Sequence, residues 1–466
     1  MLRHFFTNSF GILTSRVLGF VRDLLTAATL GASVWSDVFF VAFKLPNLFR
    51  RLFGEGAFTQ AFLPNFVKSK KKGLFFAEIL FKFAAFMLAL SGLVMIFAPF
   101  VARLLAAGFD EATLALAVPL VRINFWYLFL IFIVTLFAAV LQYKNHFATT
   151  AFSTALLNIS MICALGIANL VGASESAATY FLSYGVVIGG ALQVGVHILA
   201  FYKLGLAPLF KFGSAKFLRG SRSDTKGFWA NFFQGVVGSS ATQLGDFLTT
   251  IIASFLSVGA ISYLYYANRI FQLPLALFAI ALSTAIFPKI SKQIKAGDEI
   301  KARQMLEKSF HLLFFLLLFS TLGAVFLARE IIWLLFERGA FSRENTEMAA
   351  NVLQMAMIGL LPFGLYKLFS LWLYANFKQK IAAKISIYSL FVNLALCLAL
   401  FRFGAPGLAL AGSLQGAFLF GCVIFIFGFK EFLAIIANKK TLLTLAGAAV
   451  FGCVLYYLEK YLYAYL

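Results

Sequence analysis

Long apolar runs separated by short polar segments follow one another along the whole chain. A helix needs about 20 consecutive, mostly apolar residues to cross the hydrocarbon core of a bilayer. Thirteen such runs can be placed, so the pattern predicts an all-α polytopic membrane protein. The predicted spans are residues 8–30, 34–53, 74–100, 117–142, 147–171, 178–202, 228–256, 260–287, 309–335, 348–376, 381–401, 406–429 and 441–458.

The composition agrees with this pattern. Of the 466 residues, 62% are hydrophobic and 12% are charged. Soluble domains carry about 25% charged residues, so a soluble globular protein is excluded. The first apolar run carries internal charges and lacks a clear cleavage site, which indicates a retained helix and not a signal peptide.

Membrane topology accounts for the net charge of +21, because most basic residues fall on one side of the membrane. With the amino terminus in the cytoplasm, 24 Lys and Arg residues fall in cytoplasmic segments and 6 in external ones. Cytoplasmic loops of membrane proteins carry such an excess, so we predict a multi-pass protein with a cytoplasmic amino terminus. The charge is accounted for by topology, which argues against nucleic acid as a partner.

Nine basic residues lie within the predicted spans or at their ends. A guanidinium near the bilayer centre costs at least about 2.5 kcal/mol, and such residues usually line a wet cavity or bind something. Lys82 and Arg122 lie near helix ends, where they can reach the headgroups. The nine are Arg16, Arg22, Lys44, Arg50, Arg51, Lys82, Arg122, Arg269 and Lys367.

An internal repeat divides the chain into two halves. Leu45-Pro46 in the second predicted span is echoed by Leu273-Pro274 in the eighth. Six spans separate the copies, so both halves enter the membrane in the same sense, and such pairs of bundles place a substrate site at their interface. We predict a six-helix lobe over residues 1–203, a basic cytoplasmic linker over 204–226, a second six-helix lobe over 227–430 and an additional transmembrane helix region over 431–466.

Several blocks of sequence closely resemble the MurJ/MviN lipid II flippases, which belong to the multidrug, oligosaccharidyl-lipid and polysaccharide exporter superfamily. The resemblance covers most of the chain, although this chain has room for one span after the twelve-helix core where the family usually has two. The blocks that carry it are Ser15-Arg16-Val17-Leu18-Gly19-Phe20, Arg22-Asp23, residues 37–51, Glu55-Gly56-Ala57-Phe58, Tyr265-Tyr266-Ala267-Asn268-Arg269 and Glu337-Arg338-Gly339-Ala340-Phe341.

The resemblance implies a transporter that moves lipid II, the undecaprenyl-diphosphate-linked peptidoglycan precursor, from the inner to the outer leaflet of the bacterial cytoplasmic membrane by alternating access. It implies two six-helix bundles around a central cationic cavity, with lipid II and the bilayer as partners and the cell-wall synthesis machinery as a further candidate. The residues expected in that cavity are Ser15, Arg16, Arg22, Asp37, Lys44, Arg50, Glu55, Ser262 and Arg269.

The chemistry of these residues fits an anionic substrate. Arginine binds the oxygens of a diphosphate in a bidentate manner and does not lose its proton. The alternative is that Arg16 pairs with Asp23, and Asp37 with Lys44, as buried ion pairs that fix helix packing and bind no ligand. Cations outnumber acids in this part of the chain, which favours the anion site.

Enzymatic chemistry is not indicated. The sequence has no phosphate-binding loop for ATP and no histidine or cysteine set with the spacing of a metal site, so we predict a protein that is not an enzyme and has no cofactor. An ion gradient or the membrane potential is then the expected source of energy. Weak candidates for a sodium site are Asp246, Thr249 and Asn393.

Two other classes of function are kept as alternatives. The first is an exporter of another polyprenyl-linked glycan or a multidrug antiporter of the same superfamily; the antiporter predicts an acidic or aromatic cavity, which the arginines oppose. The second is a non-transporting scaffold for cell-wall enzymes, in which substitution of intramembrane charges affects folding alone.

Overall fold

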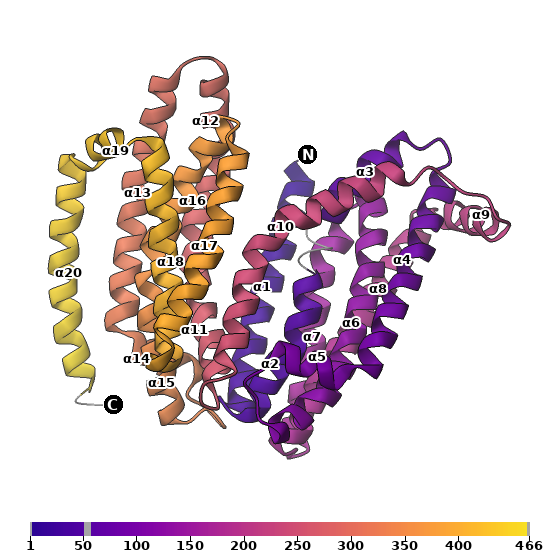
Figure 1. Ribbon diagram of the computed structural model, residues 1–466, viewed down its shortest axis with the longest axis horizontal. Helices are drawn as coiled ribbons and strands as arrows, with labels where there is room; N and C mark the ends of the chain where they lie inside the picture. Colours follow the sequence, from indigo (N-terminus) through magenta and orange to yellow (C-terminus); the bar gives the residue numbers. More distant parts are fainter. Residues whose placement is uncertain (1, 51–56, 464–466) are drawn as a thin grey trace. The chain divides into compact units, whose positions relative to one another are not determined.

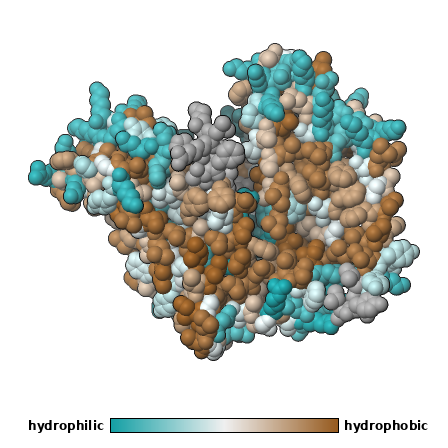
Figure 2. Space-filling view, turned by 180° about the vertical axis from the view of Figure 1, so that it is seen from behind, coloured by the Kyte–Doolittle hydropathy of each residue, from teal (hydrophilic) through white to brown (hydrophobic). Residues whose placement is uncertain are grey.

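The computed structural model describes residues 2–50 and 57–463, and every regular element in these ranges is a helix (Figure 1). The chain forms two compact units, Met1–Val258 and Gly259–Leu466. The all-α class that the apolar pattern predicts is therefore confirmed. On the face of each unit that Figure 2 shows, apolar side chains gather along the middle of the helices and hydrophilic ones at the helix ends, as a bilayer requires.

The first unit contains ten of the helices. Each of the first seven predicted spans overlaps one of them, and α3, α5 and α9 are shorter additions. The helices are α1 (Leu2–Leu30), α2 (Val34–Phe49), α3 (Ala57–Lys68), α4 (Lys72–Ile96), α5 (Ala98–Leu105), α6 (Glu111–Tyr143), α7 (Ala148–Leu170), α8 (Glu175–Lys203), α9 (Ala207–Leu218) and α10 (Lys226–Ala253).

The second unit holds the remaining six predicted spans. The eighth is interrupted by a π-helical turn, η2, after Pro274, and the tenth is divided between α15 and α16. Its elements are α11 (Ala260–Pro274), η2 (Leu275–Ile280), α12 (Ala281–Lys295), α13 (Glu299–Phe326), α14 (Ala328–Phe336), α15 (Arg343–Ile358), α16 (Leu360–Ala375), α17 (Gln379–Ala399), η3 (Phe401–Phe403), α18 (Gly404–Phe427), α19 (Phe429–Ile436) and α20 (Lys439–Tyr463).

Ten helical segments of the described residues are long and apolar enough to cross a membrane. The three predicted spans outside that set correspond to α1, α2 and α10. Helix α2 is only 16 residues long, and α1 carries Arg16, Arg22 and Asp23. Helices α1 and α2, which do not meet the length and hydropathy of a membrane span, thus carry intramembrane charge.

An aromatic cluster joins α3, α4, α6 and α10 in the first unit. Phe58 of α3 is fully buried and contacts Phe83, Phe132 and Phe228 edge to face, with ring centroids 5.4–5.9 Å apart. Edge-to-face pairs stabilise packing beyond the apolar area that they bury. Helix α10 is therefore packed on α3 within the first unit.

This packing bears on the predicted lobes. We assigned residues 227–430 to the second lobe, whereas α10 (Lys226–Ala253) belongs to the compact unit that ends at Val258. Phe228 in the first turn of α10 packs on Phe58 of α3, and this contact places α10 in the first unit. The lobe boundaries of the transporter stay a prediction.

Gly11 allows one close helix crossing, and Ser413 satisfies the backbone at one helix break. A side chain at Gly11 of α1 would come within 2.8 Å of the Ala151 Cβ on α7, so only glycine allows this close crossing. At the break between α15 and α16, the Ser413 hydroxyl of α18 donates to the carbonyls of Met355, at 2.6 Å, and Ala356. The interrupted span thus keeps its backbone satisfied inside the bundle.

The last apolar run forms the helix that it predicts, α20. Helix α20 packs on α13, where Asn438 donates a hydrogen bond to Glu307 at 3.2 Å. The described residues after α18 therefore contain one long helix, α20, and one short helix, α19.

Candidate functional site

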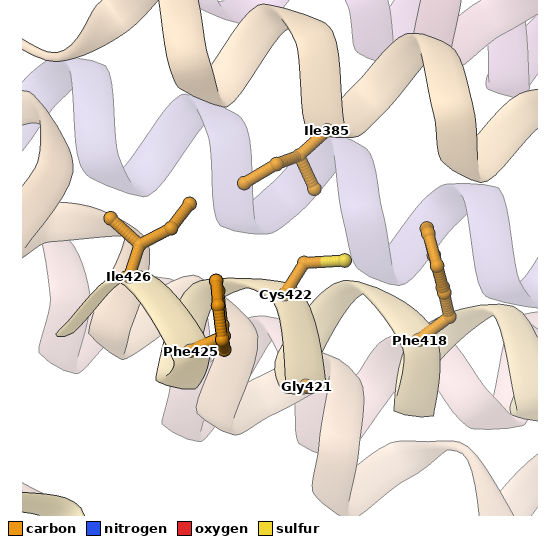
Figure 3. Close-up of a pocket in the computed structure, with 6 residues that line it drawn as sticks. All are labelled: Ile385, Phe418, Gly421, Cys422, Phe425 and Ile426. Carbon is orange, nitrogen blue, oxygen red and sulfur yellow. The ribbon is translucent and has the colours of Figure 1, made fainter. Parts of the chain in front are cut away.

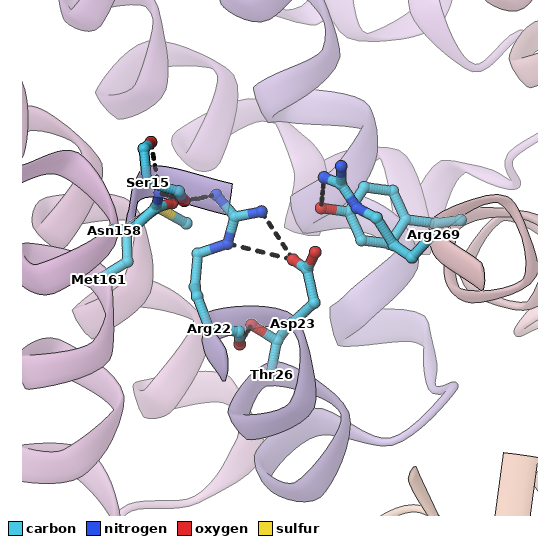
Figure 4. A network of polar contacts seen from close by, with 8 residues as sticks. Ser15, Arg22, Asp23, Thr26, Asn158, Met161 and Arg269 are labelled. Atoms are coloured by element: carbon cyan, nitrogen blue, oxygen red, sulfur yellow. Dashed lines mark hydrogen bonds and ion pairs between the residues drawn. The ribbon is translucent and has the colours of Figure 1, made fainter. Parts of the chain in front are cut away.

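Arg22 is the centre of a buried polar network on the first helix (Figure 4). Its side chain and that of Asp23 are 9% and 3% exposed. The Nη2 and Nε atoms of Arg22 donate to one carboxylate oxygen of Asp23 at 2.6 and 3.1 Å. A buried guanidinium is tolerated only with such partners, because an isolated ion loses its hydration.

Asn158 of α7 completes the network. Its side-chain oxygen accepts a hydrogen bond from Nη1 of Arg22 at 3.0 Å, and its amide donates to the Ser15 backbone carbonyl at 2.9 Å. Nη1 also contacts the Met161 sulfur at 3.8 Å. One amide group therefore joins two turns of α1 to α7 and brings Ser15 and Arg22 together.

Asn158 and Met161 are not among the residues that the sequence predicts for the site. Asn158 lies inside an apolar run, Leu156-Leu157-Asn158-Ile159, and a lone amide in a membrane span is itself a signal of a helix–helix hydrogen bond. Gly19 of α1 faces Asn158, and a Cβ at Gly19 would lie 3.5 Å from the Asn158 side-chain nitrogen, an ordinary van der Waals contact. The pairing of α1 with α7 could not be derived from sequence periodicity alone.

The structure also changes one expected pairing. We considered a buried ion pair between Arg16 and Asp23, which share a face of α1. Asp23 instead pairs with its neighbour Arg22, and Arg16 is exposed. A guanidinium exposed within a predicted span needs water or headgroups around it, because its charge is costly in hydrocarbon.

Helix α2 carries three further predicted residues. Asp37 is buried in the first turn, where the helix dipole stabilises a negative charge. Lys44 is half-buried in the middle, and Arg50 follows the last turn, where its Nε and Nη2 both donate to the Asn47 side chain at 3.1 Å. Glu55, the remaining acid of this segment, lies outside the described residues.

In the second unit, α11 carries Ser262 and Arg269. Ser262 is fully buried. The Arg269 guanidinium lies over the ring of Tyr265, 4.6 Å from its centroid, and contacts the Tyr265 hydroxyl (Figure 4). Stacking on an aromatic face is a geometry in which arginine keeps its charge and its planar donors oriented.

The weak sodium candidates stay a prediction. Asp246 is exposed on α10, and the Thr249 hydroxyl donates to the Gly245 carbonyl at 3.0 Å in the same helix. Asn393 is buried on α17 of the second unit, near the Cys397 sulfur. Within the residues that the structure describes, no group of three or more His, Cys, Asp or Glu side chains is placed to hold a metal ion.

An apolar pocket of about 490 Å³ lies between α17 and α18 (Figure 3). Its lining lacks charged side chains, so it does not suit a phosphate group. The lining residues are Ile385, Phe418, Gly421, Cys422, Phe425 and Ile426.

The chain is similar to a group of curated proteins over most of its length. It is 50% identical over 435 residues to the probable lipid II flippase MurJ of Helicobacter pylori strain ATCC 700392 / 26695, covering 90% of this chain and 94% of that protein. It is 33% identical over 403 residues to the lipid II flippase MurJ of Burkholderia cenocepacia, covering 84% and 77% of the two chains.

The fold is similar to two kinds of solved structure. One is described as lipid II flippase MurJ in an inward closed conformation, with a TM-score of 0.79, 25% identity and 98% of both chains covered. The other is an inward-facing multidrug resistance transporter of the MATE family, with a TM-score of 0.69, 14% identity, and 91% and 96% of the two chains covered. The second likeness shows the fold alone.

A family model described as lipid II flippase MurJ matches residues 26–466. That range starts after Arg22 and includes α2, with Asp37, and α11, with Arg269. The match covers nearly the whole chain, and curated relatives agree with it over most of their own length. The chain therefore belongs to the lipid II flippase MurJ family of polytopic membrane transporters.

Proposed function

We propose that this protein flips lipid II, the undecaprenyl-diphosphate-linked peptidoglycan precursor, from the inner to the outer leaflet of the bacterial cytoplasmic membrane. The observation that carries the proposal is the family match over residues 26–466, with a relative 50% identical over 435 residues. The site chemistry supports it, because buried or stacked arginines on α1 and α11 suit a diphosphate.

The surroundings of Arg22 favour the binding of an anion. Asp23 and Asn158 hold the guanidinium in one orientation, so less conformational entropy is lost when an anion approaches. The low dielectric of the span strengthens the attraction between a guanidinium and a phosphate. Arg16, exposed one and a half turns earlier, supplies a second charge on the same helix.

Transport by alternating access is the mechanism that we propose for the cycle. The division of the chain into two compact units supports it, because such transporters rock one bundle against the other. In this proposal the amino terminus is cytoplasmic, and the membrane potential or an ion gradient drives the cycle, since one charge moved across 100 mV supplies about 2.3 kcal/mol. Contact with the cell-wall synthesis machinery is a further part of the proposal.

A multidrug cation exporter is the second candidate, because the MATE transporter shares the fold. Its substrates are expected to need acidic or aromatic groups in the cavity. The basic side chains of α1, α2 and α11 oppose that reading, since a cation would meet Arg16, Arg22 and Arg269.

The test is exposure of lipid II in the outer leaflet of a bacterium depleted of its own flippase. The parent protein is compared with Arg22→Ala and Arg22→Lys variants at matched membrane levels. We expect the parent to restore exposure, Arg22→Ala to abolish it and Arg22→Lys to restore part of it. A well-inserted parent that restores none contradicts the proposal, and then another polyprenyl-linked glycan becomes the leading substrate.

A further inference from the structure

Helix α16 is mostly interior, and its exposed residues are Lys367 and, near its end, Tyr374. It packs on α12, α13, α17 and α18 within the second unit. Between Leu360 and Leu373, Lys367 is the one exposed residue, although this stretch lies inside the apolar segment Arg343–Ala375. A charged group thus reaches the surface from a mostly buried helix.

This exposure differs from that of a lipid-facing helix. Helix α17 shows the lipid-facing pattern, with Ile387, Phe391 and Leu398 exposed at helical spacing. The positions next to Lys367 on its own face, Gly364 and Leu371, are buried. Lys367 is therefore flanked by buried residues and not by an apolar stripe, and an intramembrane charge in such a position is a candidate for binding a polar ligand.

Lys367 also has no acidic partner. Among the residues that the structure describes, no carboxylate lies within ion-pairing distance of its ammonium, whereas Arg22 and Lys82 pair with Asp23 and Glu78. Its Nζ lies 6.0 Å from the centroid of the neighbouring Tyr366 ring. A lysine that only stabilises the fold is expected to have a partner, because an unpaired charge in a span costs stability.

Lys367 is linked by packing to the helix that bears Arg269. The spans Ala260–Lys295 and Arg343–Ala375 are both interrupted. Their first helices, α11 and α15, pack on each other, and so do their second helices, α12 and α16, so the two spans run in the same direction. Phe363, one turn before Lys367, contacts Phe271 edge to face at 6.0 Å, and Phe271 follows Arg269 by two residues. Arg269 and Lys367 thus lie on neighbouring spans of the second unit, with Lys367 farther along the direction in which both spans run.

We propose that Lys367 is an anion-binding residue of the transport path that contacts the diphosphate of the lipid-linked substrate. This inference rests on the proposed function. An ammonium on a flexible stem can follow a moving phosphate as a point charge, whereas Arg269 is stacked on Tyr265. Lys367 is thereby a second phosphate contact at a different depth.

The experiment measures binding of lipid II to the purified full-length protein in nanodiscs, with the neutral alcohol undecaprenol as the uncharged probe. The variants are Lys367→Gln, Lys367→Arg and the control Lys384→Gln, which removes an exposed lysine from α17. We expect Lys367→Gln to bind lipid II about tenfold more weakly, as for a lost charged hydrogen bond. We expect Lys367→Arg to bind within about threefold of the parent, and Lys384→Gln to bind like the parent.

The melting temperature of the lipid-free protein separates binding from folding. Because no carboxylate of the described residues pairs with Lys367, Lys367→Gln is expected to melt at or above the temperature of the parent, with unchanged binding of undecaprenol. Equal binding of lipid II by Lys367→Gln and the parent overturns this inference and leaves the proposed function standing. An equal loss for lipid II and undecaprenol, with a lower melting temperature, assigns Lys367 a structural role and also overturns it. A parent that binds no lipid II contradicts the proposed function itself.

Discussion

The Asn158 side-chain oxygen lies 3.0 Å from Nη1 of Arg22, which joins α7 to α1 across 136 residues of sequence. Without this acceptor, Nη1 of the buried guanidinium loses its oxygen partner on α7. The amide of the same side chain donates to the Ser15 carbonyl. Asn158 thus positions the charge that we propose to bind the substrate, and it does so from a helix that carries no charge of its own.

Substitution of Asn158 by alanine is expected to impair both stability and flipping. Removing a partner from a buried charged group costs about 1–3 kcal/mol, and the guanidinium of Arg22 becomes free to change its orientation. The melting temperature in detergent and the outer-leaflet exposure of lipid II measure the two effects. Asn169→Ala is the control, because Asn169 joins the same two helices through Thr29 at an exposed position; an equal loss in both variants argues against a special role for Asn158.

The crossing of α1 and α7 is expected to depend on Gly11. Alanine there places its Cβ 2.8 Å from the Ala151 Cβ and near the Ala151 backbone, so the helices must separate. Overpacking of this kind costs about 1–3 kcal/mol. Thermal melting of Gly11→Ala should show a lower transition, whereas Gly166→Ala, with open space at its Cβ, should be neutral or slightly stabilising. A Gly11→Ala variant as stable as the parent contradicts this account of the packing.

Ser413 is expected to protect the break between α15 and α16. Its hydroxyl is the donor for the Met355 and Ala356 carbonyls. In Ser413→Ala these carbonyls lose that donor, which costs about 1 kcal/mol. Hydrogen exchange of the amides around Gly359 should become faster in Ser413→Ala. Ser320→Ala serves as the control, because Ser320 bonds only to the Leu316 carbonyl within its own helix; unchanged exchange at Gly359 in Ser413→Ala excludes a role in the break.

The linker after α9 is expected to be held by Glu78. This acid on α4 accepts hydrogen bonds from the Ser223 backbone, at 2.6 Å, and from the Ser223 hydroxyl, at 2.9 Å. In Glu78→Ala the segment around Ser223 loses both bonds and opens more often, so trypsin should cleave after Arg222 several-fold faster. Glu175→Ala, on the exposed first turn of α8, is the control; cleavage at the parent rate in Glu78→Ala shows that other contacts hold the linker.

Substantial parts of the fold follow from the sequence. Apolar runs define where helices cross a membrane, because the bilayer core accepts no unsatisfied backbone. Every predicted span overlaps a helix of the structure, from α1 to α20. The intramembrane arginines stand out for the same reason, since charge in an apolar run is costly and needs an explanation.

The local partners of those charges do not follow from the sequence. Helical spacing allowed Asp23 to pair with Arg16, and the structure pairs it with Arg22. Helical spacing places residues on a face of one helix but does not say which helix packs there, so Asn158 was missed. The assignment of α10 to the first unit likewise depends on contacts of Phe228 with Phe58.

The sequence by itself determined the class of protein, the positions of its membrane helices and the surplus of cations in its first two spans, because hydrophobicity and charge act along the chain. Tertiary structure alone decided how Arg22 is held and that Lys367, on a mostly buried helix, has no carboxylate partner within the part of the chain that the structure describes. Hydrogen bonds and exposure depend on which helices are neighbours, and that is a property of packing in three dimensions.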